Sequence, residues 1–244
     1  MTSKFEGNFD MVAQNYLFSS DHISGEDLKY VSEFFRGVSF DFMLDLATGA
    51  GHFTTVFNSN IKIAFDYSLN MLKTAIKKYD IDLGVKGDVA FLPFREGSFD
   101  LVSCRIAMHH FKNIQHFWFE VHRVLKKNGY FVLIDSIVDI DDAYLNCIEY
   151  VRDNSHIRSF SVKEIINFSD GKFRLEDFRN FYKKHDIEEW GRRLNPSEYL
   201  FQSIKEQFKK LPENIKEELG VEEIDGVIRS YTDKKGLFIF KKIC

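Results

Sequence analysis

The stretch FMLDLATGAGHFTTVF at positions 42–57 combines an apolar run, a carboxylate and two glycines one residue apart, followed by a helix-like pattern. The apolar run predicts a buried strand over 42–46, and the last residues predict a helix over 51–57. Gly49 and Gly51 then lie in the turn between them, where a ligand can approach the backbone closely because no Cβ intervenes. Such a turn favours a nucleotide-like ligand.

The same alternation of short apolar runs and helical patterns continues along the chain. It predicts strands over 61–65, 83–85, 99–104 and 130–134, and helices over 69–78 and 114–127, the last closed by Gly129. Alternation of this kind predicts right-handed βαβ units, hence an α/β fold with a parallel sheet covered on both faces.

The flanks of this core are mostly helical in pattern. Ser24 stands three residues before Asp27, a capping-box spacing, and predicts an amphipathic helix that ends at Gly37. The later part of the chain predicts helices over 143–151, 162–168 and 198–208 and a closing strand over 237–243, whereas 172–185 fits a strand or a frayed helix.

We expect one domain over residues 1–244, because no proline- or glycine-rich linker divides the chain. Its core would span about 38–138, and the part at 139–244 would complete the sheet and cover the substrate. Residues 1–37 would form a helical lid over the ligand, with the aromatic residues Phe9, Tyr16 and Phe18, although packing of this segment on the sheet fits equally well.

Composition limits the classes of partner. The net charge is −4 and no basic cluster exceeds a dipeptide, so nucleic acid is not an expected partner. No signal-peptide pattern opens the chain and no apolar run approaches the ~20 residues of a membrane span, so we expect a soluble, cytoplasmic protein. Cys104, Cys147 and Cys244 are too scattered for a disulfide framework or a metal site.

Two carboxylates narrow the choice of ligand. Asp45, at the mouth of the glycine turn, opposes a pyrophosphate but favours a ligand with an ammonium or sulfonium group, although it could also merely cap the turn. Thr54 stands where the dinucleotide fingerprint needs a small residue. Asp66 ends the next strand, about 20 residues on, where a carboxylate can accept hydrogen bonds from both ribose hydroxyls of an adenosine. Together these features favour S-adenosylmethionine over NAD.

Five ordered motifs between residues 42 and 135 carry a resemblance to a known family. The series DLATGAG, DYSLNML, GDVAFLPF, SFDLV and EVHRVLKKNGYFVLID resembles the class I S-adenosylmethionine-dependent methyltransferases, especially the methyltransferase type 11 group, which includes quinone-biosynthesis C-methyltransferases. CRIAMHHF at 104–111 and RDNSHIRSFS at 152–161 resemble a bacterial and archaeal subgroup of small-molecule methyltransferases.

This resemblance implies a fold and an activity. The implied fold is Rossmann-like and doubly wound, with a mostly parallel seven-stranded sheet, an N-terminal helical segment and C-terminal helical additions. The implied reaction transfers a methyl group to a small-molecule acceptor and converts S-adenosylmethionine to S-adenosylhomocysteine.

The resemblance also implies contacts to the methionine part of the cofactor. It places Gly49 and Gly51 under this part, Asp45 near the ammonium group and Arg105 beside the cofactor at the end of a strand. Ala47 stands where the family usually has its first glycine, and its methyl group is small enough to be tolerated there if the residue keeps a negative φ.

The implied contacts to the adenosine part come from the next two motifs. Asp66 would hold the ribose, and Tyr67 and Met71 would flank the adenine. Asp88 would accept a hydrogen bond from the adenine amino group, while the Val89 amide donates to the ring.

Histidines near the fourth predicted strand are candidates for the acceptor side. A base is needed only if the acceptor loses a proton, and histidine suits that role at neutral pH. His109, His110 and His156 are the candidate catalytic residues, with His22 as a further one and Asp153 as an orienting partner. A structural role for each remains an equal alternative, and the histidine spacing does not predict a metal site.

Two other function classes remain open. A short-chain NAD-dependent oxidoreductase needs a Tyr-x-x-x-Lys pair on a helix, and the one such spacing, from Tyr231 to Lys235, is expected in a polar turn. A non-catalytic S-adenosylmethionine-binding protein would carry the same cofactor motifs. The sequence indicates neither the acceptor nor the oligomeric state.

Overall fold

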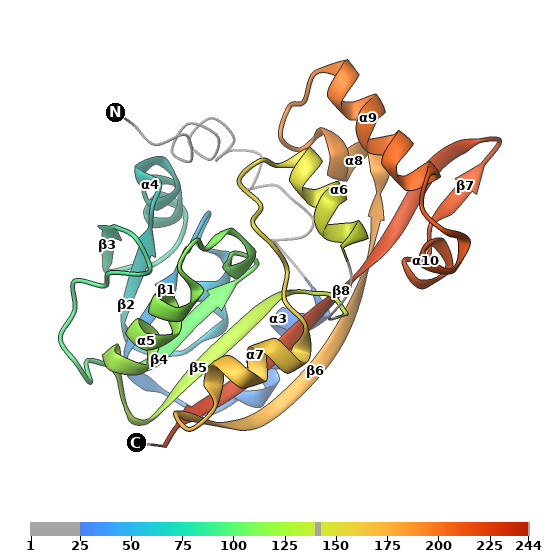
Figure 1. Ribbon diagram of the computed structural model, residues 1–244. Coiled ribbons are helices and arrows are strands. Elements are labelled where there is room, and N and C mark those ends of the chain that lie inside the picture. Colours follow the sequence, from blue (N-terminus) through green and yellow to red (C-terminus); the bar gives the residue numbers. More distant parts are fainter. Residues whose placement is uncertain (1–24, 140–142, 244) are drawn as a thin grey trace.

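The computed structural model describes residues 25–139 and 143–243, which build one eight-stranded sheet with helices on both faces (Figure 1). The strand order is β3-β2-β1-β4-β5-β8-β6, and β7 pairs with β8. The strands are β1 (Phe40–Leu46), β2 (Ser59–Asp66), β3 (Leu83–Lys86), β4 (Phe99–Arg105), β5 (Leu125–Ile137), β6 (Phe173–Asp186), β7 (Glu222–Ile224) and β8 (Val227–Lys242).

The strands β1 to β5 run parallel, and β8 is antiparallel to β5, β6 and β7. The strand order reverses between β1 and β4, which places a crevice at their carboxyl ends. The predicted Rossmann-like, mostly parallel α/β sheet is therefore confirmed, with β7 as a short additional strand.

Helices cover the sheet in two groups. Figure 1 shows α5 and α7 in front of the sheet and α3 behind it, while α6, α8 and α9 gather at one end of β6 and β8. The helices are α3 (Glu26–Phe34), α4 (Leu69–Lys78), α5 (Ile114–Val124), α6 (Tyr144–Arg152), α7 (Val162–Ser169), α8 (Ile187–Arg192), α9 (Glu198–Lys209) and α10 (Glu213–Glu218), with 3-10 turns η1 (His52–Val56) and η2 (Met108–His110). None of these helices is long and apolar enough to cross a membrane.

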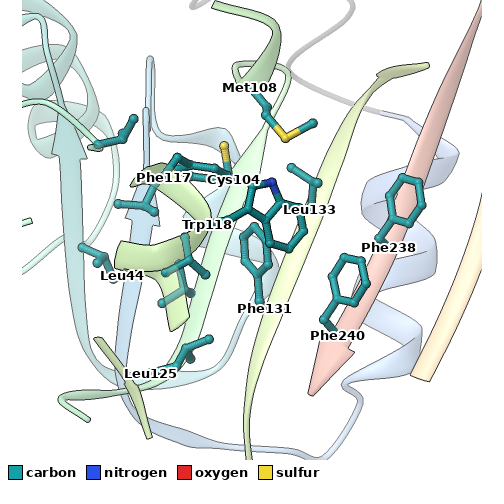
Figure 2. Packing of buried hydrophobic residues seen from close by; sticks show 14 of the residues in the cluster. Leu44, Cys104, Met108, Phe117, Trp118, Leu125, Phe131, Leu133, Phe238 and Phe240 are labelled. Carbon is teal, nitrogen blue, oxygen red and sulfur yellow. The ribbon is translucent and has the colours of Figure 1, made fainter. Parts of the chain in front are cut away.

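Trp118 of α5 is the centre of the larger core cluster (Figure 2). Its ring meets Phe131 of β5 edge-on at 5.3 Å and Phe240 of β8 at 5.5 Å between centroids. All three side chains are buried, and complete burial of such a side chain stabilises the fold by about 1.5–3 kcal/mol. These contacts hold the antiparallel strand β8 against the parallel part of the sheet.

Helix α4 fixes the segment that follows β2. The Ser68 side chain caps the helix by accepting a hydrogen bond from the Met71 amide at 3.1 Å. Leu72 and Ala75 face inward and pack with Ala64 of β2. The residues between β2 and α4 are therefore held in one conformation at the carboxyl end of the sheet.

Two predicted helices in the core differ from the structure. The helix expected over 51–57 is the shorter 3-10 turn η1, and α5 ends at Val124 instead of reaching residue 127. Leu125 is fully buried and pairs with Phe99, so it begins β5. Gly129 therefore lies in a strand and caps no helix; a Cβ there would stand 3.0 Å from the Asp100 carbonyl oxygen.

The N-terminal expectations are met only in part. Helix α3 begins at Glu26, so Gly25 rather than Ser24 occupies its N-cap position, and Gly37 follows with a φ of 79°. Ser24 itself lies outside the described residues. The candidate base His22 and the proposed lid aromatics, Phe9, Tyr16 and Phe18, also lie outside the described residues.

The C-terminal part resolves one open alternative. Residues 173–186 form strand β6, which pairs with β8 along its length. A register shift between Leu175 and Asp177 explains why the aromatic residues fit neither a helical nor a strand period. The short helices α8 and α10 and the strand β7 were not predicted, because each is too short to show a period.

Strand β8 begins at Val227, well before the predicted start at residue 237. Tyr231 and Lys235 thus lie on a strand, and the expectation of a polar turn is wrong. Both residues are buried, with 0% and 6% exposed surface. A Tyr-x-x-x-Lys pair on a strand lacks the helical placement that the oxidoreductase alternative requires.

Candidate active site

A cavity of about 310 Å³ lies at the carboxyl ends of β1, β2 and β4. This is the volume range of small-molecule sites, and the position is the crevice of an open α/β sheet. The structure brings the predicted cofactor contacts together here, with the exception of Gly51. The predicted residues that line the cavity are Asp45, Ala47, Gly49, Asp66, Tyr67, Met71, Asp88, Val89 and Arg105.

Backbone amides orient the Asp66 carboxylate at the end of β2. Its Oδ2 accepts a hydrogen bond from the Gly49 amide at 2.8 Å, and its Oδ1 accepts one from the Ser68 amide at 2.8 Å. Each carboxylate oxygen has a second lone pair, so both can accept a further hydrogen bond. Asp66 thus lines the cavity at the end of β2, and its contact with ribose hydroxyls stays a prediction.

The two glycines of the turn have different roles. A Cβ at Gly49, where φ is 54°, would meet no atom of the described residues within 4 Å, so these residues leave open space at the turn. A Cβ at Gly51 would stand 2.8 Å from the Ala75 Cβ of α4. Gly51 does not line the cavity, and close packing of α4 explains why it is glycine.

Ala47 departs from expectation. Its φ is 49°, so Ala47 does not meet the condition of a negative φ under which its methyl group is readily tolerated. The chain reverses directly after β1, where the Thr48 amide donates to the Phe65 carbonyl at 3.1 Å, and this reversal requires a left-handed residue. Alanine tolerates that conformation at a cost of roughly 1–2 kcal/mol.

Asp45 is buried at the floor of the cavity. Its carboxylate accepts hydrogen bonds from Ser103 Oγ at 2.6 Å and Thr48 Oγ1 at 3.0 Å. Burial outweighs these hydrogen bonds and raises the pKa of Asp45 to about 7. A cationic ligand group nearby would favour the ionised carboxylate, which is the behaviour expected of a partner for an ammonium group.

Two exposed aromatic residues are among those that line the cavity. Tyr67 is 42% exposed and Phe91 is 67% exposed, and both line the cavity together with Met71. The Asp88 Oδ1 accepts a hydrogen bond from the Ala90 amide at 2.9 Å, which orients the second carboxylate oxygen. Phe91 was not singled out from the sequence, because an isolated aromatic residue after a strand has no distinctive spacing.

Arg105 forms a buried ion pair that the sequence did not predict. Its Nε and Nη2 atoms both lie 2.8 Å from Asp27 Oδ2, and the two side chains are only 5% and 6% exposed. The spacing of Ser24 and Asp27 indicates a helix cap for Asp27, whereas the structure places its carboxylate in this ion pair. The pair connects α3 to the end of β4 and holds Arg105 against the cavity, as predicted for that residue.

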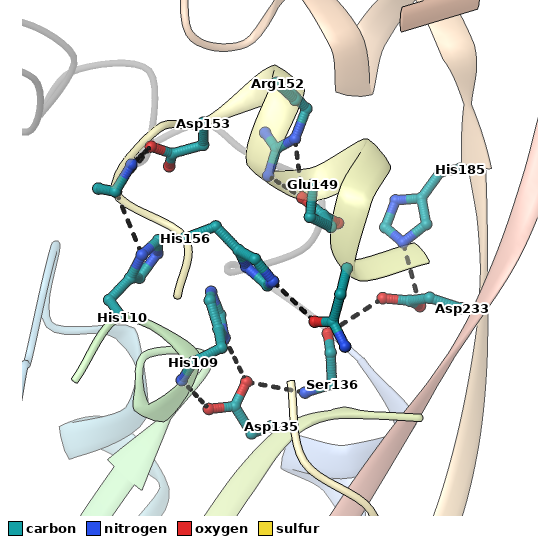
Figure 3. A network of polar contacts seen from close by, with 12 residues as sticks. His109, His110, Asp135, Ser136, Glu149, Arg152, Asp153, His156, His185 and Asp233 are labelled. Atoms are coloured by element: carbon teal, nitrogen blue, oxygen red, sulfur yellow. Dashed lines mark hydrogen bonds and ion pairs between the residues drawn. The ribbon is translucent and has the colours of Figure 1, made fainter. Parts of the chain in front are cut away.

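The candidate histidines His109, His110 and His156 lie close together (Figure 3). The ring centroid of His109 lies 4.2 Å from that of His110 and 5.3 Å from that of His156. His110 lines the large cavity, whereas His109 and His156 line a second cavity of about 40 Å³. Within residues 25–139 and 143–243, no three metal-ligating side chains converge to hold an ion.

Asp135 orients His109, a role the sequence had assigned to Asp153. The His109 Nδ1 lies 2.6 Å from Asp135 Oδ1, and the His109 amide donates to Asp135 Oδ2 at 3.2 Å. Asp153 instead accepts from Ser155 Oγ at 2.6 Å, and that hydroxyl lies 3.1 Å from His110 Nδ1. A carboxylate at the end of β5, as at the ends of β1 and β2, was the signal that could have identified Asp135.

The three histidines differ in basicity. Burial lowers the pKa of His109, but the Asp135 carboxylate outweighs it and raises this pKa above its ordinary value. Burial and the adjacent His109 lower the pKa of His110 to about 3 and that of His156 to about 4. Of the three, only His109 can hold a proton near neutral pH.

Comparisons with known proteins indicate the family of this domain. A family model described as a methyltransferase domain matches residues 44–133. The uncharacterised methyltransferase YcgJ of Bacillus subtilis is 29% identical over 201 residues, which are 78% of this chain and 78% of that protein. The demethylmenaquinone methyltransferase of Thermotoga maritima is 30% identical over 135 residues, which are 52% of this chain and 59% of that protein.

A similar solved structure is also a methyltransferase candidate. The crystal structure of a candidate methyltransferase from Bacillus halodurans superposes with a TM-score of 0.84 at 29% identity, over 90% of this chain and 100% of that chain. The matched residues 44–133 contain the glycine turn, the Asp66 and Asp88 motifs, and Arg105 at the end of β4. Residues 44–133 therefore form a methyltransferase domain, and the protein is a methyltransferase that uses S-adenosylmethionine as its methyl donor.

Proposed function

We propose that this methyltransferase acts on a small-molecule acceptor that loses a proton on methylation, and that His109 takes this proton. The His109–Asp135 hydrogen bond of 2.6 Å carries the proposal. The acceptor class is supported by the net charge of −4 and by the modest cavities, which suit neither a nucleic acid backbone nor a protein surface.

The donor side would be held by the residues that line the large cavity. Asp66 would accept from the ribose hydroxyls, Asp45 would face the ammonium group, and Asp88 would accept from the adenine amino group. Tyr67 and Met71 would flank the adenine. When bound, S-adenosylmethionine supplies an electrophilic methyl group on a sulfonium sulfur, so the chain has mainly to position the acceptor and exclude water.

The acceptor side needs one group that can hold a proton. With Nδ1 directed to Asp135, the Nε2 atom of His109 is left to accept the acceptor proton, and the Asp135 carboxylate stabilises the imidazolium that forms. His110 and His156 are neutral near pH 7 because their pKa values are about 3 and about 4. We therefore assign them hydrogen-bonding and positioning roles.

The experiment uses methyl-labelled S-adenosylmethionine with separated low-molecular-mass and macromolecular fractions of a cell extract. We expect the label in the low-molecular-mass fraction. The His109→Gln variant should lose about 10²–10⁴ in rate without a change in S-adenosylhomocysteine affinity. His122→Gln, at a histidine of α5 that lines neither cavity, is the matched control. Label in RNA or protein would contradict the acceptor class, and full activity of His109→Gln would contradict the base.

A further inference from the structure

A small cavity of about 40 Å³ lies beside His109. Ile106 lines both this cavity and the large cavity of about 310 Å³, which we call the donor cavity. Ile106 has a φ of 54°, a left-handed conformation that a β-branched residue rarely adopts. Its amide donates to the Ile134 carbonyl at 2.7 Å, so the strained backbone is held in place by β5. Strain of this kind concentrates at functional sites, and here it forms the wall between two cavities.

Lys235 of β8 lines the small cavity and is only 6% exposed. Across residues 25–139 and 143–243, no side chain forms a hydrogen bond or an ion pair with its ammonium group. The adjacent Lys234, in contrast, pairs with Glu218 at 2.8 Å. Lys235 is thus a largely buried residue whose ammonium group has no partner among the described residues, and this arrangement favours an anionic ligand as its counter-ion.

The charged residues that line this cavity favour an anion. Arg152 and Arg193 line it together with Lys235, against the carboxylates Glu149 and Asp233. Both carboxylates are already engaged: Glu149 pairs with Arg152 at 2.8 Å, and Asp233 lies 3.1 Å from His185 Nε2. The Arg152 guanidinium is held further by Trp190, whose ring centroid lies 4.5 Å away.

The size of the cavity selects the anion. A water molecule needs roughly 10–15 Å³ of such space, so this cavity holds about three water-sized atoms. The three heavy atoms of a carboxylate group match that space better than the five of a phosphate.

We propose that the small cavity binds a carboxylate group of the methyl acceptor, with Lys235 as its counter-ion. The acceptor is then a small carboxylic acid whose proton-bearing nucleophile lies on the Ile106 side, next to the donor cavity. This assignment rests on the proposed function for the identity of the acceptor, but the carboxylate site itself is independent of methyl transfer.

Nuclear magnetic resonance of ¹³C-lysine-labelled protein with bound S-adenosylhomocysteine tests the site. The probes are acetate, lactate, the uncharged amides of these two acids, and inorganic phosphate. The Lys235 signal is assigned by its absence from the spectrum of Lys235→Met. We expect the carboxylates to shift the Lys235 signal saturably and the amides to leave it unchanged. Equal shifts with the amides, no shift with the carboxylates, or tighter binding of phosphate would overturn the proposal.

Two variants separate a binding role of Lys235 from a structural one. Lys235→Met should weaken carboxylate binding at least about tenfold, read from the methyl signals of the probe, and should keep or raise the melting temperature because it removes an unpaired buried charge. Lys234→Met should leave carboxylate binding unchanged. Undiminished binding in Lys235→Met, or a melting temperature well below wild type, would overturn the assignment.

The same assay separates this proposal from the proposed function. Acetate and lactate are bound without methyl transfer, so carboxylate binding is measured independently of any role of His109 as a base. If His109→Gln loses no methyl transfer while Lys235→Met loses carboxylate binding, the base assignment fails and the carboxylate site stands.

Discussion

Asp135 holds His109 through two contacts, one to the ring Nδ1 at 2.6 Å and one from the backbone amide at 3.2 Å. The carboxylate is fully buried and also accepts the Ser136 amide at 2.8 Å, so it cannot turn away from the imidazole. Strand β5 and the turn η2 are thereby joined at the acceptor side. The same contact sets the orientation of the ring and the affinity of the ring for a proton.

Asp135→Asn should shift the titration of His109 to lower pH. The charge of Asp135 now raises the pKa of His109, so removing it leaves burial as the dominant cause and lowers that pKa. Because His109 accepts a proton only when neutral, the wild-type rate should rise with pH through the raised pKa, and this rise should move to lower pH in the variant. Histidine-ring NMR titration and a pH–rate profile measure both shifts.

The charged and titratable groups that face His109 are Asp135, Glu149, Asp153, His110 and His156. Glu149→Gln serves as the control, because its contribution to the pKa of His109 is smaller than that of Asp135. An unmoved His109 titration in Asp135→Asn would contradict the proposed coupling.

Gly49→Ala should mainly weaken ligand binding, whereas Gly51→Ala should mainly lower the stability of the fold. At Gly49 the added methyl meets no protein atom, so we expect roughly 1–2 kcal/mol of strain and at least a tenfold loss of S-adenosylhomocysteine affinity. At Gly51 the methyl would stand 2.8 Å from the Ala75 Cβ, so overpacking and strain together should cost about 2–4 kcal/mol of folding free energy. Urea unfolding and calorimetric titration distinguish the two; the opposite pattern would reverse the roles assigned here.

Asp66→Ala should weaken S-adenosylhomocysteine binding by about 2–4 kcal/mol, since it removes the acceptor of two hydrogen bonds from the ribose. Asp82→Ala is a matched control: the Asp82 carboxylate also accepts a backbone amide, that of Lys62 at 2.8 Å, but it does not line the cavity. The dissociation constant of Asp82→Ala for S-adenosylhomocysteine should equal that of the wild type. An unchanged affinity in Asp66→Ala would place the ribose elsewhere.

Asp27→Ala should destabilise the fold by about 3–5 kcal/mol, because it leaves the buried Arg105 guanidinium without its carboxylate. Glu188→Ala breaks the ion pair with Arg192, whose side chains are 54% and 45% exposed, and should cost no more than about 0.5 kcal/mol. Chemical denaturation measures both losses. Similar losses in the two variants would show that burial does not increase the contribution of the Asp27–Arg105 pair to the free energy of unfolding.

The donor side of the site could be predicted because its signals are local. Asp45 and Asp66 each follow an apolar run, and the carboxyl ends of parallel strands converge at one edge of the sheet. The roles within the turn could not be separated in this way. Gly49 and Gly51 look alike in sequence, and only the contact of position 51 with Ala75 distinguishes packing from ligand approach.

The sequence by itself determined the parallel core and the methyl donor, because short apolar runs, glycine turns and terminal carboxylates are each written within a few neighbouring residues. Only the tertiary structure decided the acceptor side. Strand β8 inserts between β5 and β6 in the antiparallel direction, which brings Lys235 beside Ser136 and close to His109. That pairing depends on side chains buried between segments far apart in the chain, and no local pattern of residues encodes it.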